Sequence, residues 1–207
     1  MTYAMGGHQA SGTAVTASDV PVSKLDNDSL IVRLHYTVNH LSRWLTPIHN
    51  RALLDRTVFR GQPSVKDLVA LMRDEELRVY PMFHLMAYEN NPNLDRLAPM
   101  PRSDRQLAYD ANASALATMA ELRRLRHSTM SLLRNLPNDA WQRTGTSRKE
   151  HDWQIRTLAE YLAQHDLEVL YQIDTTLDRL GVREGLSPAA RTHLDELLRM
   201  TPVTMRK

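Results

Sequence analysis

The chain has 207 residues, of which 42% are hydrophobic and 24% charged, a composition typical of a soluble protein with one sizeable core. Lysine and arginine number 26 against 24 acidic residues, so the net charge of +2 gives no support for nucleic acid as a partner. The absence of cysteine excludes disulfides, thiolate nucleophiles and cysteine-ligated zinc, so any metal would need His, Asp or Glu.

No uninterrupted apolar run approaches the roughly 18 residues that a membrane span requires, so no membrane is expected as a partner. Residues 1–23 are small, polar and weakly charged, and they lack the basic start and apolar segment of a secretory signal. We therefore predict that residues 1–23 form a flexible N-terminal arm. Residues 24–207 are predicted to form a single helical domain that resides in the cytoplasm.

Helical periodicity governs the chain after this arm, and no segment alternates as a half-buried strand does. A first helix is predicted over residues 28–45, before Pro47 ends it. A second helix begins at Ser64, with Asp67 three residues on as in a capping box, and reaches Glu89. The inward stripe of this second helix is predicted to contain Leu68, Leu71, Met72, Glu75, Val79, Met82 and Met86.

Three prolines and no helical period mark residues 90–102, which predicts a long irregular connection. Helix resumes over residues 103–136, with a break near Asp110, and a fourth long helix is predicted over residues 153–180. A short closing helix fits residues 187–200. Four long amphipathic helices with one long connection predict an all-α fold, a four-helix bundle.

A single histidine interrupts the apolar stripe of the last long helix, within the sequence LAEYLAQHDLEVLYQI. Steps of three and four place the following residues on one face: Ile155, Leu158, Leu162, His165, Val169, Ile173 and Leu177. His165 is therefore expected to face the core. A buried imidazole needs a hydrogen-bond partner or a metal, since an unpaired buried polar group costs about 1 to 3 kcal/mol.

Several kinds of catalytic site find no support in the sequence. The paired Glu-x-x-His motifs of two-iron bundles are absent, as are the His-Glu-x-x-His motif of zincins and the Gly-x-Ser-x-Gly turn of serine hydrolases. A cluster of Arg123, Arg124, Arg126 and His127 could contact phosphates, but it is more typical of a solvated helix face.

The order of these features resembles the DinB-like superfamily over roughly residues 30–180. Four segments carry the resemblance, and they read PSVKDLVALMRDEELRVY, NNPNL, LRNLPNDAWQRTGT and TLAEYLAQHDLEVLYQI. The resemblance implies a four-helix bundle with a long connection between helices 2 and 3 and a short C-terminal helix. That superfamily includes metal-dependent thiol-using transferases and hydrolase-like enzymes.

The resemblance also implies a metal position. In that superfamily a divalent metal is usually held by three histidines, one on the second helix and two spaced by four residues on the last long helix. His165, followed by Asp166, matches the first of the spaced pair. The second falls on Val169, and the ligand of the second helix falls on Leu71. One imidazole does not make a specific zinc or nickel site, which normally needs three or four protein ligands.

Two interpretations of these positions stay open. In one, Glu75 and Glu168 substitute for the lost ligands and rebuild a carboxylate and histidine site with His165. In the other, Leu71 and Val169 fill the former metal cavity with hydrocarbon, and His165 hydrogen-bonds Glu75 or a buried water.

We therefore predict a DinB-like protein that has lost the three-histidine site and acts as a non-catalytic binding or interaction protein. It is predicted to need no cofactor and to form a homodimer, with a pocket at Leu71, Glu75, His165 and Val169 as the place for a small-molecule ligand. The alternative is a metal-dependent thiol S-transferase or small-molecule hydrolase, with zinc or nickel in a site rebuilt around His165. A third interpretation is a structural partner whose residues 1–23 dock on another chain.

Overall fold

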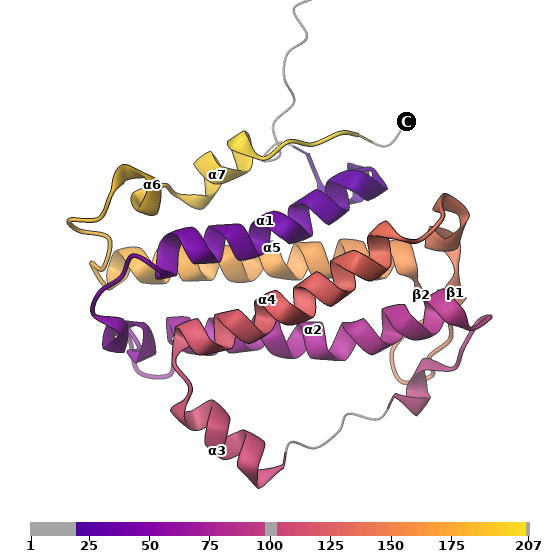
Figure 1. Cartoon of the computed structure of the whole chain (residues 1–207), viewed down its shortest axis with the longest axis horizontal. Helices are drawn as coiled ribbons and strands as arrows, with labels where there is room; N and C mark the ends of the chain where they lie inside the picture. The colour runs from indigo at the N-terminus through magenta and orange to yellow at the C-terminus, as the bar shows by residue number, and fades with distance from the viewer. Residues whose placement is uncertain (1–19, 98–102, 206–207) are drawn as a thin grey trace, which may run out of the picture.

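Helices make up most of the computed structural model, which describes residues 20–97 and 103–205 (Figure 1). The four long helices are α1 (Asn27–Leu45), α2 (Val65–Tyr88), α4 (Ala115–Arg134) and α5 (Ile155–Arg179). The shorter ones are α3 (Asp104–Asn112), α6 (Pro188–Arg191) and α7 (Leu194–Met200), with 3-10 turns at Val22–Lys24, Arg51–Asp55, Leu94–Arg96 and Asn138–Gln142. Strands β1 (Thr144–Gly145) and β2 (Trp153–Gln154) pair antiparallel. The predicted all-α four-helix bundle is confirmed.

Capping residues fix where the helices begin. Ser64 accepts a hydrogen bond from the Asp67 backbone amide, and the Asp67 carboxylate accepts one from the Ser64 amide, so the predicted capping box is present. Ser103 and Ser114 cap α3 and α4 in the same way, through their side-chain oxygens. The predicted break in the third helical stretch is therefore confirmed as the junction of α3 and α4.

The helices run up, down, down and up. Residue numbers increase in the same direction along the contact between α2 and α4, because Arg73 pairs with Glu121 and Glu76 pairs with Arg126. The two helices are therefore parallel, and the segment between them, which contains α3, must return along the length of the bundle (Figure 1). By the same test, α1 runs antiparallel to α4 and parallel to α5. Because α2 is parallel to α4, it lies antiparallel to α5.

Each long helix packs against two others, in the ring order α1, α4, α2 and α5. The bundle therefore has four seams, and the α1–α4 seam lies opposite the α2–α5 seam. At the C-terminal end of the chain, α6 contacts α1 and α7 contacts α5, so the closing segment covers the α1–α5 side (Figure 1). None of the helices in the described ranges is long and apolar enough to cross a membrane.

The apolar core is divided into two clusters, one toward each end of the bundle. One cluster contains residues 41–48 of the α1 region, 65–72 of α2 and 169–177 of α5, and the other contains residues 30–34 of α1, 79–87 of α2 and 155–163 of α5. Val20 and Val22 are buried in the second cluster, so packing begins before residue 24. The rest of the predicted arm, residues 1–19, lies outside the described residues. Between the two clusters the helices bring charged side chains together.

Candidate functional site

A buried guanidinium occupies the centre of the bundle. The Arg126 side chain, 1% exposed, donates through Nη1 and Nη2 to the two carboxylate oxygens of Asp166 at 2.5 and 3.1 Å. Its Nε donates to the Glu76 carboxylate at 2.8 Å, and both carboxylates are fully buried. One cation from α4 therefore bridges an anion from α2 and an anion from α5, with the bidentate geometry that makes such pairs strong.

Hydroxyl and carbonyl groups complete this network. Thr37 of α1 donates to the Asp166 carboxylate at 3.0 Å, and Thr129 of α4 donates to the Glu76 carboxylate at 2.5 Å. Arg126 also donates to the backbone carbonyl of Leu34 at 3.0 Å. All four long helices thus supply a group. Burial alone would lower the pKa of the Arg126 guanidinium, but the adjacent carboxylates of Asp166 and Glu76 outweigh burial and raise it.

The sequence carries a signal for this network in the spacing of its charged residues. Asp166 lies four residues after Leu162 and three before Val169, so it fits the apolar stripe of α5 as well as His165 does. Glu76 and Arg126 occupy equivalent places on the apolar stripes of α2 and α4. Charged residues at stripe positions on three helices, with signs that can pair, are typical of a buried ion network.

The placement of His165 differs from the prediction. Its side chain is half-buried at the edge of α5, because the inward direction belongs to its neighbour Asp166. The imidazole stacks on Tyr161 with a centroid distance of 6.4 Å and an interplanar angle of 28°. Its Nδ1 atom is buried, and within the described residues it has no hydrogen-bond partner. The expected hydrogen bond to Glu75 is therefore not formed.

The placement of Leu71 is also a correction. Its side chain is 47% exposed, whereas it was expected to fill a cavity inside the bundle. The other apolar residues of the predicted α2 stripe are buried, and Glu76, whose carboxylate pairs with Arg126, takes the inward position that was predicted for Glu75. Val169 is 2% exposed and packs in the core as expected.

The carboxylate of Glu75 is paired with an arginine. The Arg78 guanidinium donates three hydrogen bonds to Glu75, at 2.7, 3.0 and 3.2 Å, and one to Glu150 at 3.0 Å. It also lies 5.5 Å from the ring centroid of Tyr161, beside His165. Burial alone would lower the pKa of the Arg78 guanidinium, but the hydrogen bonds to Glu75 outweigh burial and raise it. Burial and the negative charge of Glu75 both raise the pKa of the Tyr161 hydroxyl. The α2–α5 seam thus holds an ion pair next to the predicted position.

One group of side chains in the described ranges has the spacing of metal ligands, and it lies elsewhere. Asp174 and Asp178 on α5 and His193 before α7 bring one ligand atom each within 4.8 Å of the others. Arg183 enters this group, pairing with both aspartates and lying 3.1 Å from His193 Nδ1. The Arg183 guanidinium also stacks 5.2 Å from the Trp44 ring. These contacts hold the C-terminal segment against α1 and α5. The Arg183 guanidinium takes the place that a metal cation would have between the two aspartates and His193.

Comparisons with known proteins find similarity in structure only. No family model matches the chain, and no curated protein matches it. The structure is similar to YfiT from Bacillus subtilis, a probable metal-dependent hydrolase with an unusual four-helix bundle topology. The TM-score is 0.57 and the identity 19%, over 78% of this chain and 89% of YfiT.

A second similar structure is a point mutant of the mycothiol-dependent maleylpyruvate isomerase. Its TM-score is 0.50 and its identity 16%, over 77% of this chain and 62% of the isomerase. Identities this low establish the fold alone. The four-helix-bundle fold that the resemblance to the DinB-like superfamily implied is confirmed, because this chain shares the fold of YfiT.

Proposed function

We propose that this protein is a DinB-like bundle without the three-histidine metal site, and that it acts by binding a ligand or partner rather than by catalysis. The observation that carries this proposal is the ion pair between the Arg78 guanidinium and the Glu75 carboxylate, which lies next to His165. Glu75 is the nearest substitute for the lost ligand of α2. Its oxygens already accept three hydrogen bonds from a cation.

Simple electrostatics support the same proposal. A divalent ion bound to Glu75 would have to displace Arg78 or sit beside its positive charge. Two of the three ligand positions implied by the superfamily carry hydrocarbon side chains, Leu71 and Val169, which supply no lone pair. A zinc site needs three or four protein ligands, so the imidazole of His165 alone falls short.

One observation favours the alternative, a metal-dependent thiol S-transferase or small-molecule hydrolase with zinc or nickel in a rebuilt site. The Nδ1 atom of His165 is buried and unpaired among the described residues, as a ligand nitrogen waiting for a metal would be. YfiT is a probable metal-dependent hydrolase and the isomerase depends on mycothiol, so both chemistries occur on this fold. Such a site would need Arg78 to swing away from Glu75.

Zinc titration by isothermal calorimetry separates the two functions. We expect no saturable one-to-one binding to the native protein. The double variant Leu71→His/Val169→His restores the implied histidine set and should bind one zinc ion per chain. Its affinity should exceed any residual zinc binding of the native protein at least about tenfold, a gain of about 1.4 kcal/mol or more. Saturable binding to the native protein that disappears in His165→Ala would contradict the proposal. Failure of the double variant to bind would contradict the assigned ligand positions.

We also propose that the chain acts as a homodimer in the cytoplasm. Leu71 and Leu77, each 47% exposed on α2, are apolar side chains that a second copy could cover. Light scattering on purified protein should then give twice the 23.7 kDa of one chain, and Leu77→Ser should shift the mass toward that of the monomer. A monomer mass for the native protein at all concentrations tested would contradict the dimer.

A further inference from the structure

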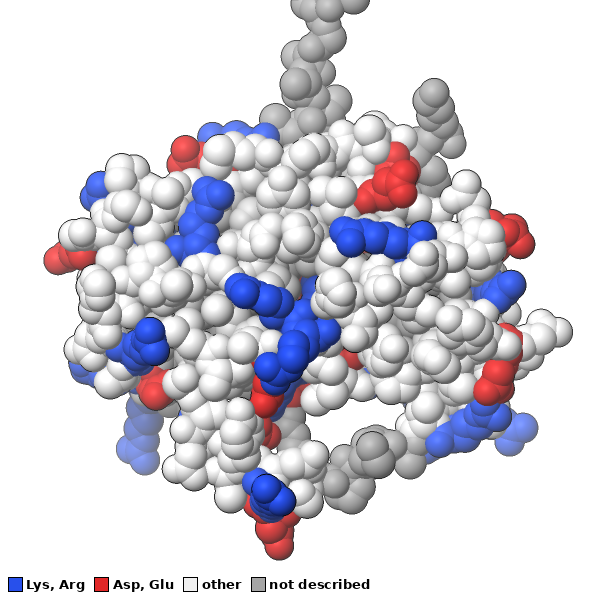
Figure 2. Space-filling view, viewed as in Figure 1, with Lys and Arg blue, Asp and Glu red and all other residues white. Residues whose placement is uncertain are grey.

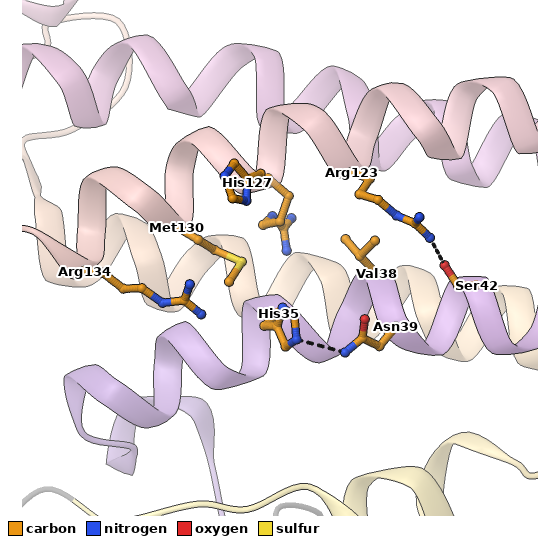
Figure 3. Close-up of a pocket in the computed structure, with 9 residues that line it drawn as sticks. His35, Val38, Asn39, Ser42, Arg123, His127, Met130 and Arg134 are labelled. Carbon is orange, nitrogen blue, oxygen red and sulfur yellow. Dashed lines mark hydrogen bonds between the residues drawn. The ribbon is translucent and has the colours of Figure 1, made fainter.

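An open groove runs along the α1–α4 seam, on the side of the bundle opposite the α2–α5 seam (Figure 3). Its volume is about 580 Å³. The polar side chains along it are His35, Asn39 and Ser42 from α1 and Arg123, Arg126, His127 and Arg134 from α4. A space of this size suits a small organic molecule.

The charge of the groove has one sign. Arg123 and Arg134 lie toward its two ends, with His127 between them, and none of its lining residues is acidic. The arginines are eleven residues apart on α4, which corresponds to about 16 Å along the helix axis. Figure 2 shows basic side chains gathered at the centre of the face that carries α1 and α4. Arg126 also reaches the groove, but its guanidinium is already paired with Glu76 and Asp166 in the core.

Hydrogen-bond donors in the groove are available to a ligand. In the described part of the chain, neither Arg134 nor His127 has a hydrogen-bond or ion-pair partner. Arg123 donates to the Ser42 hydroxyl, which holds its guanidinium at the rim while its other N–H groups stay unused (Figure 3). Asn39 and His35 hydrogen-bond each other at 3.0 Å on the facing helix. Each arginine can therefore donate a bidentate pair of hydrogen bonds to one carboxylate.

Two apolar side chains lie on the floor between the two arginines, beside Arg126. Val38 and Met130 are buried there, at 6% and 4% exposure, and their side chains face the groove (Figure 3). A ligand that matches this pattern has a negative group at each end and a hydrocarbon chain between them. We propose that the α1–α4 groove binds an elongated aliphatic dicarboxylate. This inference rests on the proposed binding role and names its ligand class, while using none of the residues of the α2–α5 seam.

Calorimetric titration of the full chain with azelate, in low-salt buffer containing EDTA, tests the proposal. We expect one azelate per chain with a dissociation constant below about 1 mM. The shorter dicarboxylate succinate and the monocarboxylate nonanoate should each bind at least about tenfold more weakly, because each loses one of the two guanidinium contacts. Added salt should weaken azelate binding, since both arginines are exposed.

Three single variants decide which residues act. Arg123→Gln and Arg134→Gln should each weaken azelate binding at least about tenfold. Arg124→Gln removes an exposed arginine of the same helix that does not line the groove, and it should leave binding unchanged. All three variants should have the same melting temperature as the native protein, since each replaces an exposed side chain. Absent azelate binding, equal binding of nonanoate, or equal effects of all three variants would overturn the proposal. Because EDTA is present, none of these outcomes bears on metal binding at His165.

Discussion

Replacing Arg126 with methionine is expected to lower the free energy of unfolding by about 3 to 5 kcal/mol. The change removes the one cation that Glu76 and Asp166 share, and it leaves two fully buried carboxylates facing each other without compensation. For a chain of this size the loss corresponds to a fall of roughly 10 °C in the melting temperature. Urea denaturation followed by circular dichroism measures the effect.

Two further variants isolate the cause. Arg124→Met changes an exposed arginine two residues away and should alter stability by less than about 0.5 kcal/mol. The triple variant Arg126→Met/Glu76→Gln/Asp166→Asn removes all three charges and keeps acceptors for the two threonine hydroxyls, so it should recover much of the loss. A single Arg126→Met variant as stable as the native protein would show that the network contributes nothing.

Acidification is expected to destabilise the protein through His40, a buried histidine of α1. Burial lowers the pKa of His40 from 6.5 to about 4, and the charges of Arg43 and Arg33 act in the same direction. His40 is 4% exposed, and its Nε2 has no hydrogen-bond partner among the described residues. The folded state therefore holds the neutral imidazole at a pH where the unfolded chain already binds a proton.

The sign of the effect follows from linkage. Between pH 6.5 and about pH 4 the unfolded state binds more protons at this residue, so stability is present above pH 6.5 and is lost as the pH falls through that window. The total contribution is on the order of 3 kcal/mol. We expect His40→Leu to flatten the pH dependence of the unfolding free energy by about 2 to 3 kcal/mol between pH 7 and pH 4.5. His49→Leu, which changes an exposed histidine, is the matched control. Identical pH profiles for the native protein and His40→Leu would contradict this account.

The helices could be predicted from the sequence because their signals are local. Spacing of apolar residues, the capping pair Ser64 and Asp67, and the prolines of residues 90–102 each act within a few residues of the boundary they set. The four long helices accordingly lie where they were expected. The resemblance to DinB-like proteins pointed to the same fold.

The orientation of charged side chains could not be predicted in the same way, because it depends on partners far away in the sequence. On α2 both Glu75 and Glu76 fit a helical stripe, and on α5 both His165 and Asp166 do. The buried member of each pair is the one that meets Arg126, which lies 50 residues from Glu76 and 40 residues from Asp166. Apolar periodicity gives no weight to a charged residue, so Arg126 was placed with a solvated helix face and the burial of Glu76 and Asp166 was not predicted.

The groove on the α1–α4 seam was missed for a related reason. Arg123 and His127 belong to a cluster that, taken alone, is typical of a solvated helix face. The facing residues His35, Asn39 and Ser42 lie on α1, more than 80 residues before Arg123 and His127 in the chain. Only the antiparallel packing of α1 on α4 brings the two sets together.

Metal content of the untagged native protein tests the central claim most directly. Inductively coupled plasma mass spectrometry should be applied to the protein as purified, and again after incubation with zinc or nickel followed by desalting. We predict far less than one metal ion per chain in each sample, because Arg78 holds Glu75 and the side chains of Leu71 and Val169 offer no ligand atom. Near-stoichiometric metal that is lost in His165→Ala would contradict the account and would make the metal-dependent enzyme the better interpretation.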